Sequence, residues 1–149
     1  MTQNGLSARY PRVEISSEPT VMEMQAIMKP LLDFNAAHGC PVDLEPVAIL
    51  LKDENELIVG GLWGRTVYQW LFVEHLVVPS EARGQNLGSL LMETAEEIAK
   101  KRGCIGSWLT TLSFHAQGFY ERLGYEVFAQ LPDSPAPHSR ILLRKTLTP

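Results

Sequence analysis

The sequence predicts an α/β fold: a mixed central sheet of about six to seven strands, flanked by helices on both faces. Short apolar runs at hairpin spacing occupy the first half of the chain, and they predict antiparallel strands. In the second half a strand-like run, an amphipathic helix and another strand-like run follow one another, which predicts a crossover between parallel strands. Antiparallel and parallel pairs in one chain together require a mixed sheet.

The first predicted elements are a short strand near residues 12–15 and a helix after it. Ser16, Ser17 and Pro19 are helix start signals. Apolar residues recur at helical spacing after them: Met24, Ile27, Met28, Leu31 and Leu32. Since a proline inside a helix removes one hydrogen bond and clashes with the preceding turn, we expect Pro30 to kink or split this helix.

Two β-branched runs, residues 47–51 and 57–62, flank a charged turn and predict a hairpin. A third and longer run, residues 67–78, is rich in aromatic and β-branched residues and ends at Pro79, which a central ladder would not accommodate. We expect this third run to be the central strand. Strands at residues 105–111, 125–131 and 140–145 complete the predicted sheet.

The clearest helix covers residues 85–101. Apolar side chains recur along one face of it: Leu87, Leu90, Leu91, Ala95, Ile98 and Ala99. Charged side chains take most of the other face: Glu93, Glu96, Glu97, Lys100 and Lys101. This spacing predicts the i,i+4 ion pairs Glu96–Lys100 and Glu97–Lys101. A shorter helix, residues 114–123, follows the next strand and ends at Gly124.

Length and composition predict a single domain, residues 1–149. The formal net charge of −4 argues against a nucleic-acid partner, which calls for a basic patch. No apolar run reaches the roughly 20 residues that a membrane helix needs. The first residues lack the pattern of a signal peptide, so we expect a cytoplasmic protein without membrane contact.

The cysteines and histidines predict no metal site. Cys40 and Cys104 are the two cysteines, and neither pairs with a histidine at metal-ligand spacing. The four histidines are scattered along the chain. We expect both thiols to be reduced.

A glycine-containing junction, residues 77–89, joins the central strand to the helix at residues 85–101. Free backbone N–H groups and the positive end of the helix dipole at such a junction favour a pyrophosphate. Gly84 and Gly88 leave room for it to approach the backbone. A similar turn is also common in α/β proteins that bind no anion, so the junction alone supports both interpretations.

This junction resembles the pyrophosphate motif of the GNAT superfamily of N-acyltransferases, [Q/R]-x-x-G-x-[G/A] after a central strand. Here it reads Arg83-Gly84-Gln85-Asn86-Leu87-Gly88, with Asn86 where the family usually has glycine. The second family signature, A-x-x-F-Y-x-x-x-G-[F/Y], matches residues 116–125. Over residues 47–145 the chain thus resembles a short bacterial single-domain GNAT N-acetyltransferase.

The resemblance implies that acetyl-CoA is the cosubstrate and that a primary amine attacks its thioester directly in a ternary complex. It also implies a bulge that splays the central strand and frees backbone groups. The residues implied for acetyl-CoA binding are Leu76, Val77, Val78, Arg83, Gly84, Gln85, Asn86, Leu87, Gly88, Ser89, Phe119 and Tyr120. The acceptor stays open, because residues 24–43 and 132–138, where the family builds its acceptor site, carry no recognisable motif.

Two side chains are candidates for catalysis. Tyr120 matches the family tyrosine near the thioester sulfur, where a phenol can protonate the departing thiolate; the alternative is a core tyrosine whose hydroxyl finds a partner. Glu74 is the leading base, since strand alternation predicts that it shares a face with Leu76. The alternative for Glu74 is a carboxylate paired with an arginine. His75, expected on the opposite face, and a water chain are the other candidate bases.

Two further expectations follow. The missing glycine at Asn86 supports a second hypothesis, a non-catalytic module that binds acyl-CoA as a ligand or sensor. Release of free CoA thiol separates the enzyme from such a module. Trp63, Trp70 and Trp108, with the closing strands, supply more large apolar surface than a small domain always hides, which predicts a homodimer.

Overall fold

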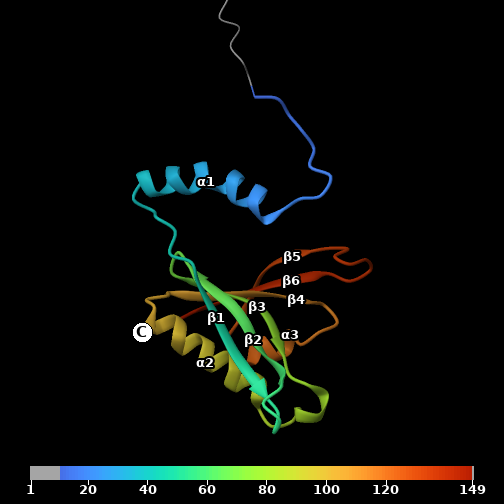
Figure 1. The fold of residues 1–149 in the computed structure, drawn as a ribbon. Helices are drawn as coiled ribbons and strands as arrows, with labels where there is room; N and C mark the ends of the chain where they lie inside the picture. Colours follow the sequence, from blue (N-terminus) through green and yellow to red (C-terminus); the bar gives the residue numbers. More distant parts are fainter. Residues whose placement is uncertain (1–10, 149) are drawn as a thin grey trace, which may run out of the picture. The chain divides into compact units, whose positions relative to one another are not determined.

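The structure of the protein, a computed structural model, describes residues 11–148 (Figure 1). Contacts divide the chain into two compact units, Met1–Pro41 and Val42–Pro149. The single domain expected over residues 1–149 therefore stays a prediction. Within the described residues, no helix is long and apolar enough to cross a membrane.

In the described part of the first unit, residues 11–41, the structure has one helix, α1 (Val21–Ala37). A capping box starts it: Glu23 N donates to Thr20 Oγ1 at 3.2 Å, and Thr20 N donates to the Glu23 carboxylate at 2.7 Å. The helix continues through Pro30, so the predicted split does not occur.

The strand predicted near residues 12–15 is wrong. This stretch has no regular secondary structure, and Val13 and Ile15 are 98% and 91% exposed. A strand needs a neighbour to take its backbone hydrogen bonds, and none of the described strands pairs with this stretch. Its β-branched residues favour a strand, but the sequence alone does not show whether a neighbouring strand is available to pair with it.

The second unit is built on a sheet whose described strands are β1 (Glu45–Lys52), β2 (Ile58–Val67), β3 (Trp70–Val77), β4 (Gly106–Leu112), β5 (Glu126–Leu131) and β6 (Arg140–Thr146). Their spatial order is β1-β2-β3-β4-β6-β5. Only β3 and β4 are parallel, so the mixed α/β sheet is confirmed, with six strands in the described residues. The short 3-10 helix η1 (Ser80–Ala82) and α2 (Leu87–Lys101) connect β3 to β4, and α3 (Gln117–Arg122) connects β4 to β5 (Figure 1).

The long run at residues 67–78 is two elements rather than one strand. Val67 ends β2, Tyr68 and Gln69 form a turn, and Trp70 begins β3. Both turn residues have positive φ, 47° and 66°, as a two-residue hairpin of this hand requires. Glycine or asparagine usually occupies such a turn. Because neither occurs at these two positions, the sequence did not predict the turn.

Helix α2 packs its apolar face against the sheet, and α3 lies on the same side (Figure 1). The core contains Leu91, Ala95 and Ala99 as predicted, together with the fully buried Met92. Two parts of the predicted pattern are wrong. Leu90 is exposed, and Glu96, placed by periodicity with the other charged residues, is only 6% exposed.

The ion pairs of α2 also differ from the i,i+4 pattern. Glu97 pairs with Lys100 at 3.0 Å, and Glu96 pairs with Lys145 of β6 at 2.8 Å. Since Glu96 faces the core, its carboxylate needs a partner from the sheet instead of the neighbouring turn.

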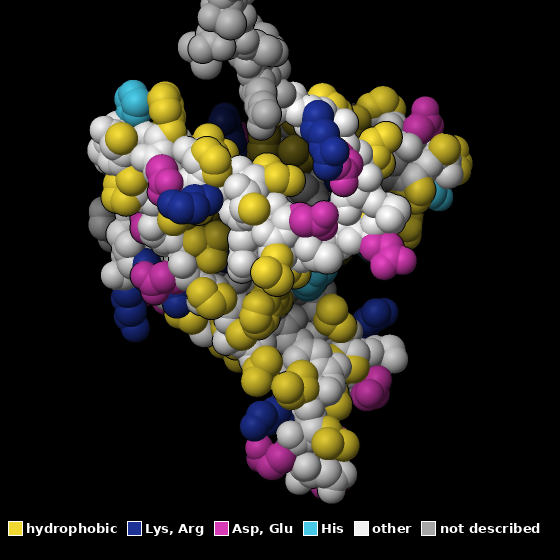
Figure 2. Space-filling view, turned by 45° about the horizontal axis from the view of Figure 1, so that its top comes forward, with side chains coloured by type: hydrophobic (Ala, Val, Ile, Leu, Met, Phe, Trp, Pro, Cys, Tyr) yellow, Lys and Arg dark blue, Asp and Glu magenta, His cyan; other side chains and the backbone are white. Residues whose placement is uncertain are grey.

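The surface keeps hydrophobic side chains interspersed with charged ones (Figure 2). Of the three tryptophans behind the homodimer prediction, Trp63 is 49% exposed, whereas Trp70 and Trp108 are partly buried. Phe72 stacks on Trp108 with ring centroids 4.0 Å apart. The homodimer stays a prediction.

Candidate active site

Strands β3 and β4 run side by side over only part of their length. Their parallel pairing joins residues 70–73 to residues 106–109 and then stops. Beyond it β3 continues, paired with β2 on its other edge. The edge of β3 that faces β4 is therefore open at its C-terminal end, and backbone groups there can bind an extended ligand. The splay that the resemblance implied is present.

A β-bulge lies where the two strands separate. Trp63 of β2 pairs with His75, but the next residue, Gly64, pairs with Val73. Glu74 is thus the extra residue of the bulge. A bulge bends its strand and shifts the alternation of side chains, which is how β3 leaves β4 at this point.

The bulge changes the face predicted for Glu74, one of the candidate bases. Leu76 packs against the core, whereas Glu74 forms an ion pair with Arg65, whose guanidinium lies over the Phe72 ring on the other face. His75 pairs across from Trp63 and shares that other face. The prediction that Glu74 and Leu76 share a face is therefore wrong, because alternation fails across an inserted residue. His75 lies on the face opposite Leu76, as predicted.

A pocket of about 760 Å³ lies along the open edge of β3. One wall is the end of β3: Leu76, Val77 and Val78. The second wall is the loop and the start of α2: Ala82, Arg83, Gly84, Asn86, Leu87, Gly88 and Ser89. The third wall comes from β4 and the α3 region: Thr111, His115, Ala116, Phe119, Tyr120 and Arg122. Segments far apart in sequence thus form one elongated cavity.

The start of α2 is open to the pocket. Asn86 is its N-cap and has the left-handed backbone conformation, φ 57° and ψ 23°. The Asn86 side chain makes no capping hydrogen bond to the described residues of the helix. The first-turn amides at residues 87–89 have no partner within the helix, and they favour an anion. The left-handed backbone explains why glycine is usual at this position and why asparagine, which tolerates it, can replace glycine.

Gly88 lets the third wall approach the helix. A Cβ added there would lie 3.1 Å from Cζ of Phe119, which is tighter than ordinary van der Waals contact. The residue therefore combines two requirements, close packing against α3 and access of a ligand to the helix amides.

The charged side chains of the pocket suit a polyanion. Arg83 and Arg122 line it from opposite walls, and none of the described lining residues is Asp or Glu. An open helix start and two cations in one pocket favour phosphate groups.

Comparison with known proteins identifies the family. The model of the acetyltransferase (GNAT) family matches residues 15–125, well over half of the chain. The chain belongs to this family. The matched span includes the bulge, the start of α2 and the α3 segment up to Tyr125, which are the parts that build the pocket.

Individual relatives agree with this assignment. The chain is 36% identical over 107 residues to an acetyltransferase of Agrobacterium fabrum, covering 72% of this chain and 78% of the relative. It is 44% identical over 105 residues to blasticidin-S acetyltransferase of Streptomyces morookaense, covering 70% and 77%. A crystal structure of an acetyltransferase from Agrobacterium tumefaciens superimposes with a TM-score of 0.83 and 32% identity, covering 91% and 99%.

As a GNAT acetyltransferase, the protein is an enzyme that uses acetyl-CoA as its cosubstrate. The alternative of a non-catalytic acyl-CoA-binding module is not supported by these relatives. The sequence argument for that alternative was asparagine at position 86 in place of glycine. This argument is weakened because Asn86 has a left-handed backbone, which asparagine tolerates.

Tyr120, the candidate acid, lines the pocket. Its ring packs edge to face against Phe119 and Tyr125, at centroid distances of 5.0 and 6.2 Å. Among the described residues its hydroxyl makes no hydrogen bond, unlike the satisfied core tyrosine of the alternative hypothesis. Burial raises the pKa of Tyr120 above its ordinary value, so the phenol keeps its proton at neutral pH.

The two candidate bases of the GNAT site lie at the bulge, outside the described lining of the pocket. Glu74 is mostly buried and paired with Arg65, which is the alternative arrangement foreseen for this carboxylate. His75 is exposed. Both side chains are on the face of the sheet away from α2.

Sequence reasoning found most of the pocket of this GNAT enzyme. All the residues implied for acetyl-CoA binding line it except Gln85, which lies in the loop with its side chain exposed. Five lining residues were missed: Ala82, Thr111, His115, Ala116 and Arg122. Arg122 carried a usable signal, because it is three residues after Phe119 and so lies on the same helix face.

Proposed function

We propose that the protein transfers the acetyl group of acetyl-CoA to a primary amine by direct attack in a ternary complex. The observation that carries this proposal is the continuity of one pocket. It runs from the open amides of α2, along the unpaired edge of β3, to the hydroxyl of Tyr120. The acetyl donor and the acid for its leaving group would therefore meet in one place.

In this proposal the first turn of α2 binds the pyrophosphate, and Arg83 and Arg122 neutralise phosphate charge. The open edge of β3 at residues 76–78 binds the extended pantetheine arm through backbone groups, as a further strand would pair. The absence of acidic residues from the described pocket lining supports binding of a polyanionic cosubstrate. Leucine and valine side chains at these positions need no specific role, because the backbone supplies the contacts.

Acetyl-CoA supplies the acetyl group as a thioester, whose C–S bond breaks as the C–N bond to the amine forms. Tyr120 gives its proton to the sulfur of the leaving group. Glu74 or His75, directly or through a water chain, takes the proton that the amine loses. Backbone N–H groups freed at the splay stabilise the carbonyl oxygen as it gains negative charge.

Release of free CoA thiol tests the proposal. With acetyl-CoA and a panel of primary amines, we expect thiol release that requires both the protein and an amine. Blasticidin S belongs in the panel because a relative that is 44% identical is named for its acetylation. Tertiary amines, which cannot form a stable amide, are the matched controls. Thiol release at the same rate without any amine would contradict transfer to an amine.

Replacement of Glu74 by glutamine tests the base through pH. If Glu74 takes the ammonium proton, the acidic limb of the pH profile of kcat/KM should disappear or flatten in Glu74→Gln. A carboxylate that only positions the acceptor would instead raise KM for the amine. Arg65→Gln is the matched control, since it breaks the same ion pair, keeps the carboxylate and should keep the acidic limb. A full rate with an unchanged profile in Glu74→Gln would pass the role to His75 or to a water chain.

Cytoplasmic location and homodimer formation belong to the proposal as expectations from the sequence. Of the three tryptophans behind the homodimer expectation, Trp63 is the exposed one.

A further inference from the structure

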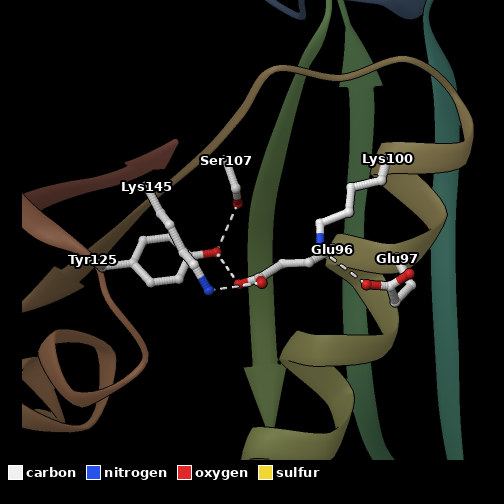
Figure 3. A network of polar contacts seen from close by, with 6 residues as sticks. All are labelled: Glu96, Glu97, Lys100, Ser107, Tyr125 and Lys145. Atoms are coloured by element: carbon white, nitrogen blue, oxygen red, sulfur yellow. Dashed lines mark hydrogen bonds and ion pairs between the residues drawn. The ribbon is translucent and has the colours of Figure 1, made fainter. Parts of the chain in front are cut away.

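A buried polar network joins α2, β4, β6 and Tyr125, which lies three residues after the end of α3 (Figure 3). Tyr125 Oη lies 3.0 Å from Glu96 Oε1 and 2.8 Å from Ser107 Oγ. Lys145 Nζ donates to the other oxygen, Glu96 Oε2, at 2.8 Å. Glu96, Ser107 and Tyr125 are all buried, so each of these polar groups depends on its partners in the network.

The chemistry of the groups fixes the direction of the hydrogen bonds. The carboxylate of Glu96, ion-paired with Lys145, can only accept, so the phenol of Tyr125 donates to it. The Ser107 hydroxyl is then free to donate to the phenol oxygen. Burial is the main cause that raises the pKa of Tyr125; the hydrogen bond from Ser107 lowers it less than burial and Glu96 raise it, so the phenol stays protonated at neutral pH.

Stability alone does not account for this network. Removing two charges from water costs free energy that their attraction often fails to recover, and apolar residues of similar size can serve a core equally well. Networks of this kind hold elements in one arrangement more than they add to stability. The question is which arrangement this one holds.

The element that most needs an anchor is α3. It has six residues, no buried residue, and no side-chain cap among the described residues. A helix this short is not stable by itself. Tyr125 anchors its end: Tyr125 N donates to the carbonyl oxygen of Tyr120 at 3.0 Å, and the two rings contact edge to face.

Through Glu96, the network connects this anchor to α2, the helix whose first turn lines the other wall of the pocket. Glu96 is eight residues after Gly88, about two turns along one rigid helix. The two walls of the pocket are thus held at a fixed separation by side chains that do not line it.

We propose that Tyr125 is a positioning residue, whose hydroxyl, held by Glu96 and Ser107, fixes α3 so that the Tyr120 phenol points at the leaving sulfur. The proposal rests on the proposed role of Tyr120 as the acid. It assigns to the network a function in turnover that is separate from binding of acetyl-CoA.

Tyr125→Phe tests this role, because it keeps the ring and removes only the hydroxyl. We expect kcat to fall roughly 10-fold, as for a small misplacement of a reacting group, while KM for acetyl-CoA changes less than about twofold. In a Tyr120→Phe background, Tyr125→Phe should cost almost nothing further, since the group that it positions is already absent. Glu126→Gln, which breaks an exposed pair with Arg144 at the next residue, is the matched control and should keep the wild-type rate.

The outcomes separate the two proposals. If Tyr120→Phe itself leaves kcat unchanged, the acid role fails, and the positioning role fails with it. If Tyr120→Phe lowers kcat but Tyr125→Phe has no effect, or an effect of equal size in both backgrounds, only the positioning role is overturned. Should Tyr125→Phe not fold, Ser107→Ala removes one hydrogen bond from the same phenol, and the same non-additivity with Tyr120→Phe is expected of it.

Discussion

Gly88→Asp should abolish binding of acetyl-CoA. The new carboxylate would stand at the first turn of α2, where the amides are expected to meet the pyrophosphate. Like charges about 4 Å apart repel by roughly 4 kcal/mol at an effective dielectric constant near 20. A difference of this size corresponds to an about 1000-fold loss of affinity, which titration calorimetry with acetyl-CoA would measure.

Two variants control for bulk and for the loop itself. Gly88→Asn has the size of aspartate without its charge, and its smaller loss of affinity would measure the crowding of Phe119 alone. Asn86→Gly places glycine at the left-handed N-cap, where no side chain is needed, and should bind acetyl-CoA at least as tightly. Undiminished affinity in Gly88→Asp would remove the pyrophosphate site from the start of α2.

The sequence predicted the parts of the site that depend on local chemistry. Gly84 and Gly88 at the start of an amphipathic helix, together with the family motif, predicted an anion-binding junction. The second motif, around Tyr120, predicted another wall of the pocket. Asn86 was noticed as a departure from the motif. Only the structure shows that its backbone is left-handed, which is a property of the loop's path rather than of one residue.

What the sequence could not predict depends on pairing between distant segments. Alternation along β3 assumes an unbroken ladder, and the extra residue at Glu74 becomes visible only against Trp63 and Gly64 of β2. Helical periodicity likewise placed Glu96 with the solvated residues. Its true partners, Tyr125 and Lys145, come from 29 and 49 residues further along the chain.

Tyr120→Phe should lower turnover while leaving the fold and acetyl-CoA affinity intact. The hydroxyl makes no hydrogen bond to the described residues, so its removal leaves no buried partner unsatisfied. If the phenol protonates the departing thiolate, kcat should fall roughly 10- to 1000-fold. Steady-state rates of thiol release, with calorimetry for acetyl-CoA binding, would separate the two quantities. Tyr68→Phe makes the same chemical change at the β2–β3 turn, outside the described lining of the pocket, and should leave kcat unchanged.

The raised pKa of Tyr120 predicts how kcat should depend on pH. A phenol is an acid only while protonated, and burial raises the pKa of Tyr120 in the folded enzyme. The protonated form of Tyr120 therefore persists to a higher pH than that of an exposed tyrosine. Wild-type kcat should accordingly show no basic limb from this group across neutral and mildly alkaline pH. In Tyr120→Phe, water must supply the proton, so the lower rate should persist over the same range. A variant that equals the wild type throughout would show that the thiolate leaves without help from Tyr120.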